Sequence, residues 1–272
     1  MSIALDIKLL RPLPHHALHI HEVSSMKTSI SGARVLVACI AVAQLFAISG
    51  ARAQEKVDDK FSKRVQRAAE VLSELTAVPD RSPPKSLLAA ATCIAVVPGV
   101  VQAGLGVGGR FGFGVASCRT ASGWSLPTFV GLKGGSVGFQ IGGQSADVVL
   151  VFVNKNAGRL ASSSFDLGAG ASVAAGPVGR NLSAETDYKL KAEIYSYSKS
   201  KGLFAGVSLS GTKWEIDYDA NTSVYGTKPS LPSGGDSKSV QTLLGTDGSG
   251  APGALQPFLE SLKKNVGEGK ES

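Results

Sequence analysis

Residues 123–154 read GWSLPTFVGLKGGSVGFQIGGQSADVVLVFVN, a glycine-rich segment that passes into a continuous apolar run over Asp147–Val153. A second run of this kind covers Thr92–Val97, and such runs are typical of strands covered on both faces. Of the 33 glycines, 22 lie between Gly99 and Gly211. Glycine inside strands permits bulges, sharp coiling and close backbone approach. We therefore predict an α+β fold built on a strongly coiled antiparallel β-sheet or a partly closed barrel.

Shorter patterns on either side of this segment predict the elements around the sheet. Apolar and polar residues alternate over Tyr188–Ile194 and Lys213–Tyr218, as in antiparallel strands with one solvated face. Apolar residues at helical spacing over Phe61–Leu75, ended by Pro79, predict an amphipathic helix. We expect short helices over Lys85–Ala91 and Lys155–Ser162.

Several sequence segments, taken in their order along the chain, resemble the SYLF domain, also called the Ysc84 actin-binding domain. Besides 123–154 they are CIAVVPGV (93–100), AAGPVGR (174–180), YSYSKSKGLFAGVSL (195–209) and DYDANTSVYG (217–226). The resemblance covers roughly half the chain. It implies a non-catalytic module that binds anionic phospholipid at a membrane surface, with phosphatidylinositol-phosphate-like lipids as ligands in relatives. Actin binding is known for some members, but an exported protein is not expected to meet actin.

The N-terminal region predicts export rather than fold. A basic start at Met26–Lys27, an apolar run over Val35–Ile48 and the Ala51–Ala53 cleavage site form a signal peptide, residues 26–53. Residues 1–25 fit no part of a signal peptide, and we interpret them as a mis-assigned extension upstream of Met26. A lipobox that ends at Cys39, with a lipid-modified N-terminus, is the alternative. We expect a periplasmic or secreted protein that is peripheral on a membrane.

Removal of this leader changes the chemistry that is available. All four histidines and both methionines precede the cleavage site, and the loss of five basic and two acidic residues lowers the net charge from +7 to +4. A mildly basic chain favours anionic surfaces. The basic residues are dispersed and no nucleic-acid-binding motif is present, so we expect no nucleic-acid partner.

The two remaining cysteines, Cys93 and Cys118, flank a glycine-rich segment that could fold back as a hairpin. In an oxidising compartment an even pair is a candidate disulfide. Two small buried side chains on neighbouring strands are an equal alternative.

Two groups of residues are candidates for lipid binding. On the first helix Lys60, Lys63, Arg64 and Arg67 form a basic stripe beside an apolar face. In one interpretation Phe61, Val65 and Leu72 insert shallowly while the basic residues meet head groups, each contributing about 1 kcal/mol. In the other, the apolar face packs on the domain.

The second group lies inside apolar or glycine-rich phrases, where Arg180, Lys199 and Lys201 could contact a phosphate. Alternatively, these cations pair with Asp147 or Asp187 inside the sheet. Gln140 and Asn221 are further polar residues in such surroundings.

Motifs for catalysis, cofactors and metals fail on their context. Gly104–Gly109 matches a dinucleotide fingerprint but no helix follows it, and the elbow-like GGSVG around Ser136 lacks a histidine base. Asp217, Asp219 and Asn221 have calcium-loop spacing without the glycine and glutamate that such a loop needs, and we expect a strand end there. Two cysteines without histidine cannot form a structural zinc site. We expect no enzyme, no cofactor and no metal.

The sequence divides into a lipid-binding domain over 54–226, a flexible linker over 227–250 rich in Pro, Ser and Gly, and a short amphipathic segment over 251–272. That last segment could dock on the domain or dip into lipid. Alternative functions are a cell-envelope protein-interaction module and a carrier that encloses a small apolar ligand within the sheet.

Overall fold

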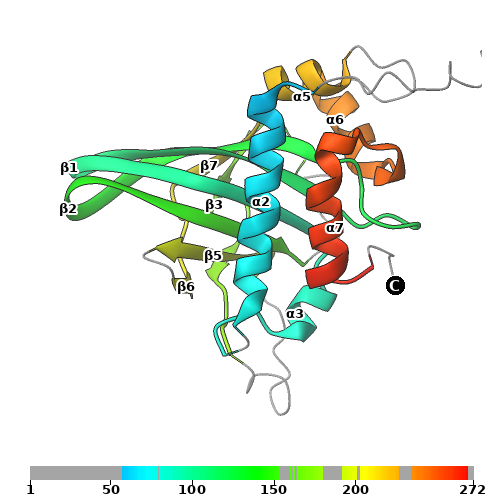
Figure 1. Cartoon of the computed structure of the whole chain (residues 1–272). Helices are drawn as coiled ribbons and strands as arrows, with labels where there is room; N and C mark the ends of the chain where they lie inside the picture. Colours follow the sequence, from blue (N-terminus) through cyan, green and yellow to red (C-terminus); the bar gives the residue numbers. More distant parts are fainter. Residues whose placement is uncertain are drawn as a thin grey trace, which may run out of the picture. The chain divides into compact units, whose positions relative to one another are not determined.

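The computed structural model describes residues 57–78, 80–153, 160, 162, 164–179, 192–200, 203–226 and 234–268. Helices and strands follow one another as in an α+β fold that begins with a helix (Figure 1). The helices are α2 (Asp59–Ala77), α3 (Lys85–Ala89), α5 (Tyr218–Tyr225), α6 (Ser237–Gly245) and α7 (Gln256–Asn265). The strands are β1 (Cys93–Cys118), β2 (Thr128–Phe152), β3 (Ser164–Leu167), β4 (Val173–Ala175), β5 (Ile194–Ser200), β6 (Leu203–Gly206) and β7 (Thr212–Ile216).

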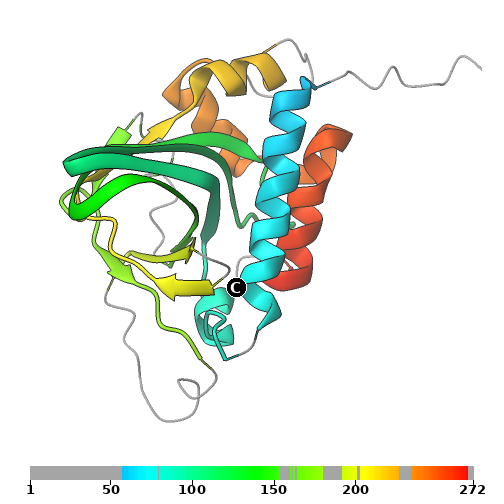
Figure 2. The same cartoon turned by 60° about the vertical axis from the view of Figure 1, so that its left-hand side comes forward.

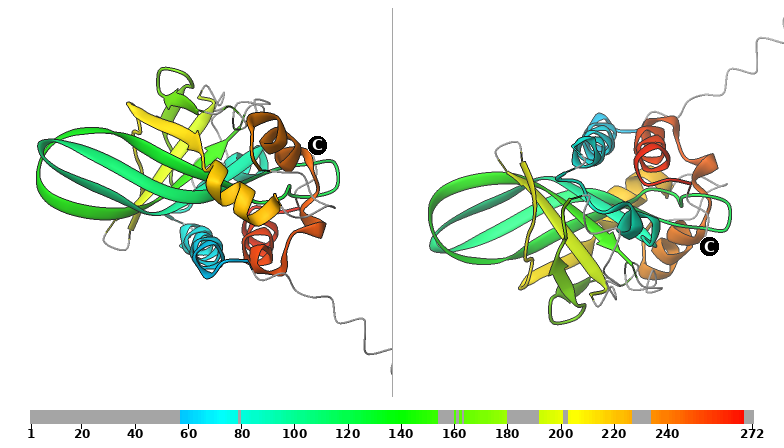
Figure 3. Two further views of the ribbon diagram at one scale, coloured as in Figure 1. Left: turned by 90° about the horizontal axis from the view of Figure 1, so that it is seen from above. Right: turned by 90° about the horizontal axis from the view of Figure 1, so that it is seen from below.

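The long strands β1 and β2 form a ribbon that is the centre of the domain. They pair antiparallel from Cys93 opposite Phe152 to Ala116 opposite Thr128, with register shifts between Val97 and Val100 and between Leu105 and Gly106. Seen from above, both strands bend back at the end away from the helices (Figure 3). The ribbon is therefore folded over, and the Cα atoms of Cys93 and Cys118, at the two ends of β1, lie 3.9 Å apart.

Glycine makes this fold-back possible because the two halves of β1 touch backbone to backbone. A Cβ atom on Gly114 would lie 2.0 Å from the carbonyl oxygen of Val96, and one on Gly108 would lie 2.2 Å from that of Ala103. No side chain fits at such distances. The glycines thus have the close-approach role that the sequence indicates.

The sheet is open, so the predicted strong coil or partly closed barrel is wrong. Within the described residues the order is β3-β7-β2-β5-β4, with β1 beside β2 and β6 beside β5. All pairings are antiparallel except that of β4 with β5. The outer strands β3 and β4 do not pair with each other. The change of direction is concentrated at the bend of the ribbon instead of being distributed around a barrel.

Folding the ribbon creates two hydrophobic cores. The inner core lies between the two layers of the sheet and contains Leu150 and Trp214. The outer core lies under the helices and contains Phe129 together with the apolar face of α2. Helices α2 and α7 run side by side over this outer core (Figure 2).

Part of the segment that the sequence predicts as a linker is folded. Within 234–250, Val240, Leu243 and Leu244 of α6 are buried, and Asp236 caps the helix by accepting a hydrogen bond from the Ser239 amide. Residues 227–233 lie outside the described residues. Of the two interpretations of the last segment, docking holds, since α7 packs against α2 through side chains that include Phe258 and Leu262.

The phrase after β7 also differs from its prediction. The strand ends at Ile216, and Tyr218 begins α5 rather than continuing the strand. Asp217 caps this helix by accepting from the amide of Ala220. The side chain of Asn221 exchanges two hydrogen bonds of 2.8 Å with the backbone of Phe129, so it has a structural role.

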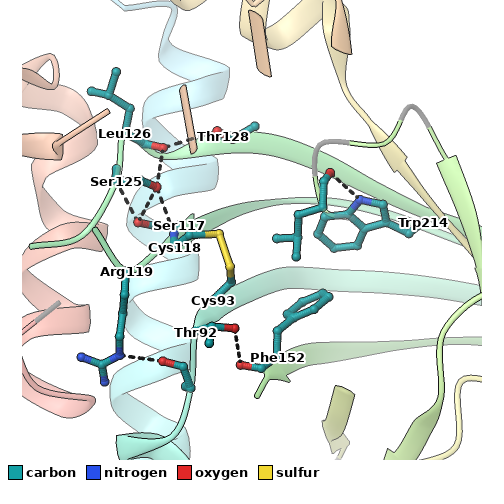
Figure 4. The surroundings of a disulfide bond; sticks show 12 residues. Thr92, Cys93, Ser117, Cys118, Arg119, Ser125, Leu126, Thr128, Phe152 and Trp214 are labelled. Atoms are coloured by element: carbon teal, nitrogen blue, oxygen red, sulfur yellow. Dashed lines mark hydrogen bonds between the residues drawn. A yellow bond between two sulfur atoms is a disulfide. The ribbon is translucent and has the colours of Figure 1, made fainter. Parts of the chain in front are cut away.

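Cys93 and Cys118 form a disulfide between the two ends of β1 (Figure 4). Buried hydrogen bonds surround it: the Cys118 amide donates to Ser125 Oγ at 2.9 Å, and Ser117 Oγ donates to the Ser125 carbonyl at 2.9 Å. The disulfide therefore fastens the folded ribbon at its open end.

Candidate functional site

The apolar face of α2 is part of the core and is not free to enter a membrane. Phe61, Val65 and Leu72, the residues expected to insert, are all buried against the sheet and α7. The Phe61 ring packs on Phe129 at a centroid distance of 5.3 Å. Shallow insertion of these side chains is therefore wrong for the folded domain, and packing on the domain, the other interpretation, holds.

Three of the five candidate basic residues that the structure describes hold α2 against the rest of the domain. Arg64 pairs with Asp217 at 2.7 Å, and Arg67 pairs with Asp147 at 3.0 Å. Lys199 on β5 pairs with Glu74 at 2.5 Å. A hydrogen bond to Glu70, followed by the charges of Asp147 and Glu74, raises the pKa of Arg67. These cations already have acidic partners, but the partner of Lys199 is Glu74 of α2 and not Asp147 or Asp187, which the structural alternative names.

Arg64 is also the centre of an aromatic cluster. Its guanidinium lies 5.2 Å from the ring centroid of Phe113 and 5.6 Å from those of Phe61 and Phe129. The side chains of Arg64 and Asp217 are only 19% and 13% exposed. Removal of the arginine would therefore leave a carboxylate with little access to water.

We expect Arg64→Gln to lower the free energy of unfolding by about 2 kcal/mol, because Asp217 loses its charged partner. Lys63→Gln, one residue earlier on the exposed side of α2, removes the same charge and is expected to change it by less than about 0.5 kcal/mol. Urea denaturation of both variants measures the difference. Equal effects would contradict the structural role of Arg64.

The remaining candidate residues are either exposed on α2 or outside the described residues. Lys60 and Lys63 are exposed on α2, and Lys60 lies 3.6 Å from the exposed Asp58. Arg180, Lys201, the leader with Cys39, and the side chains of Gln140 and Ser136 lie outside the described residues. The structure thus leaves Lys60 and Lys63 as the accessible basic residues of the predicted helix stripe.

An exposed aromatic pair, which the sequence patterns above do not predict, lies beside α2. Phe111 and Phe113 on β1 are 53% and 39% exposed, and Arg64 contacts the ring of Phe113. We call Phe111, Phe113, Arg64 and Lys133 the aromatic-basic surface. The phrase RFGFG carries the signal, since residues two apart in a strand share one face.

Charges continue this surface across the sheet. Lys133 on β2 lies opposite Phe111, and Lys213 on β7 lies opposite Lys133. Residues directly opposite in antiparallel strands present their side chains on the same face. Glu215 pairs with Lys133 at 2.5 Å, and Asp166 on β3 lies opposite Lys213. The charges on the sheet part of this surface are therefore largely balanced, and the apolar area of the phenylalanines is its distinguishing feature.

Among the residues that the structure describes, no group of His, Cys, Asp and Glu side chains could hold a metal ion. In the same residues, no helix is both long and apolar enough to cross a bilayer. The candidate site is the aromatic-basic surface, because its exposed apolar rings lie beside cations, an arrangement suited to binding.

Comparisons with known proteins show which family this part of the chain resembles. Residues 133–265 match the model of the Ysc84 family, described as Las17-binding protein actin regulator. An SH3 domain-containing YSC84-like protein 1 from Xenopus laevis is 36% identical over 178 residues, which are 62% of this chain and 53% of that protein.

Two fungal proteins are also similar. An SH3 domain-containing protein of Schizosaccharomyces pombe is 42% identical over 137 residues, which are 48% of this chain and 31% of that protein. LAS seventeen-binding protein 3 of Saccharomyces cerevisiae is 34% identical over 152 residues, which cover 54% and 33% respectively. The chain thus spans about half or less of the length of these relatives, and no solved structure matches it. Residues 133–265 of this chain are thus similar to the Ysc84, or SYLF, family.

Proposed function

We propose that this domain is a non-catalytic module that binds anionic phospholipid at a membrane surface through the aromatic-basic surface. The observation that carries the proposal is the exposure of Phe111 and Phe113 beside cations of α2 and β2. Exposed aromatic rings next to lysine and arginine are typical of surfaces that lie in the interfacial region of a bilayer.

The family supports a binding role of this kind, because it is linked to actin and to lipid binding. Phosphatidylinositol-phosphate-like lipids are the ligands that the family resemblance implies. For an exported protein we propose phosphatidylglycerol or cardiolipin, which carry the same anionic phosphate. Actin is not the partner that we propose for such a protein.

The disulfide supports export. Disulfides form and persist in oxidising compartments and are rare where thiols are kept reduced. The bridge between Cys93 and Cys118 is consistent with the signal peptide predicted over 26–53. We therefore propose a periplasmic or secreted location, with reversible attachment to a membrane.

The proposal predicts that Phe111→Ser combined with Phe113→Ser weakens binding to phosphatidylglycerol vesicles at least about tenfold. Full burial of one such ring contributes roughly 1.5–3 kcal/mol, so partial burial of two exceeds the 1.4 kcal/mol of a tenfold change. Co-sedimentation with phosphatidylglycerol or phosphatidylcholine vesicles, at low and high salt, measures the effect. Lys60→Gln with Lys63→Gln is expected to reduce the preference for the anionic vesicles.

Val178→Ser is the matched control, because Val178 is 40% exposed but lies near Asp80, beyond the other end of α2. It should bind vesicles like the parent chain. If the parent chain binds neither vesicle, the membrane proposal fails. The exposed phenylalanines would then favour a protein-interaction module, the other candidate function.

A further inference from the structure

A cavity of about 460 Å³ lies inside the folded ribbon, between its two layers. Both halves of β1 and both halves of β2 line it, and β5, β6 and the segment after β6 complete the wall. Its lining includes the apolar side chains of Val100, Leu132, Val148 and Leu209. The volume falls within the range of roughly 300–1,000 Å³ of small-molecule sites, whose walls are mostly apolar with a few placed polar groups.

Arg110 is the cationic side chain in this lining. It lies between Gly108 and Gly112 on β1, at the inward-facing positions where the two halves of the strand approach each other. A Cβ atom on Gly112 would lie 2.8 Å from Val100, across the gap. Arg110 is thus a charged side chain in a row of glycines that faces the interior of the ribbon.

The guanidinium of Arg110 is poorly satisfied. Its Nε is buried and has no hydrogen-bond partner among the residues that the structure describes, and Nη1 donates a long bond of 3.4 Å to Thr212 Oγ1. Burial lowers the pKa of Arg110, although arginine stays protonated in proteins. A buried donor without a partner is costly, and more so when it is charged.

Arg119 is also half-buried, and its hydrogen bonds show a structural role. Its Nε donates to the carbonyl of Ala91 at 2.6 Å, its Nη2 donates to that of Leu88, and its Nη1 donates to that of Glu268. Its guanidinium also stacks on Trp124 at 4.8 Å. Arg110 has none of these partners, so packing of the fold does not account for it.

We propose that the cavity binds a single acyl chain with an anionic head group, the carboxylate or phosphate lying on Arg110. The acyl chain lies along the apolar wall formed by Leu132, Val148 and Leu209. A carboxylate or phosphate can accept from two guanidinium N–H groups at once.

Polar neighbours support an oriented ligand. Gln102 and Gln144 lie opposite each other on β1 and β2, and both line the cavity with Arg110. Leu203 on β6 lines the cavity and is 55% exposed, which places it at the rim. The head group therefore meets Arg110 and the glutamines, while Leu203 marks an entrance for the chain.

The first test is titration of the full chain with palmitate, lysophosphatidylglycerol and uncharged hexadecanol, each competing with a fluorescent fatty acid. Palmitate and lysophosphatidylglycerol distinguish a carboxylate from a phosphate as the bound group, and one-to-one binding of either supports the proposal. Hexadecanol should bind at least about tenfold more weakly, because it lacks the charge for Arg110. Equal binding of all three, or none, overturns the proposal.

Arg110→Met keeps an unbranched side chain but removes the charge, and it should weaken anionic binding at least about tenfold while hexadecanol binding stays unchanged. Lys213→Met is the charge-matched control on the exposed face of β7 and should bind like the parent chain. Arg110→Met should also melt at or above the temperature of the parent chain, since it removes an unsatisfied charge. A lower melting temperature would show that Arg110 stabilises the fold, contrary to the proposal.

Ligand binding in the cavity does not depend on membrane binding. The variant with serine at positions 111 and 113 should bind palmitate normally, because both rings lie on the outer face of β1. Loss of vesicle binding with palmitate binding intact, or the reverse, shows which of the two proposals fails.

Discussion

Gly114→Ala is expected to lower the free energy of unfolding by at least about 3 kcal/mol, or to prevent folding. The new Cβ would lie 2.0 Å from the carbonyl oxygen of Val96 and 2.7 Å from the Cα of Val97. Both obstructing atoms belong to the backbone of the facing half of β1, which β2 holds in register. Overpacking that flexible side chains can relieve typically costs about 1–3 kcal/mol, and here no flexible side chain is available to move.

Gly135→Ala and Gly143→Ala are the matched controls. Both glycines lie on β2 of the same ribbon, and a Cβ on either meets nothing within 4 Å. We expect changes within about 0.5 kcal/mol for these variants. Urea denaturation followed by circular dichroism compares all three, and a Gly114 variant as stable as the controls would contradict the fold-back of the ribbon.

The sequence predicts that glycine shapes the sheet, but not how. A glycine-rich strand fits a coiled sheet, a barrel or a folded ribbon equally well. The choice depends on contacts between positions about 20 residues apart, such as Gly114 with Val96, and spacing within one strand does not reveal such pairs. The helix and the apolar strands are better predicted because their periodicity is local.

The prediction that Arg64 and Arg67 of the basic stripe on α2 contact lipid head groups failed for a related reason. Spacing places Arg64 and Arg67 on one side of the helix correctly, but their partners Asp217 and Asp147 are distant in the sequence. A cation whose partner is distant in the sequence therefore resembles a ligand contact even when it is paired in the fold. The aromatic pair Phe111 and Phe113, in contrast, could have been found, because its alternation with glycine is local.

The predicted linker shows the limit of composition. Residues 227–250 are rich in Pro, Ser and Gly, yet three apolar residues at helical spacing fix α6 on the domain: Val240 and Leu244 join the inner core and Leu243 joins the outer core. Complete burial of each contributes roughly 1.5–3 kcal/mol, which can exceed the cost of ordering a short helix. Predictions from composition fail where a few apolar side chains at helical spacing pack into a core.

Removal of the disulfide by Cys93→Ala with Cys118→Ala is expected to lower the free energy of unfolding by about 3 kcal/mol. The bridge closes a loop with a sequence separation of 25 residues, and in the chain-entropy model that loop restricts the unfolded chain by this amount. Urea denaturation with and without a reductant measures it. The parent chain should lose a similar amount on reduction, whereas the double variant should not respond to the reductant.

The response to reductant separates the bridge from the packing of the two side chains. Both cysteines are buried in the inner core, so alanine alone removes some packing whether or not the sulfurs are bonded. A parent chain insensitive to reductant would mean that packing, and not the bridge, holds the ends of β1 together. Sensitivity of about 3 kcal/mol would instead tie the stability of the folded ribbon to an oxidising compartment. A domain kept in a reducing compartment would lack that stabilisation, which is the physical basis for proposing that this protein works outside the cytosol.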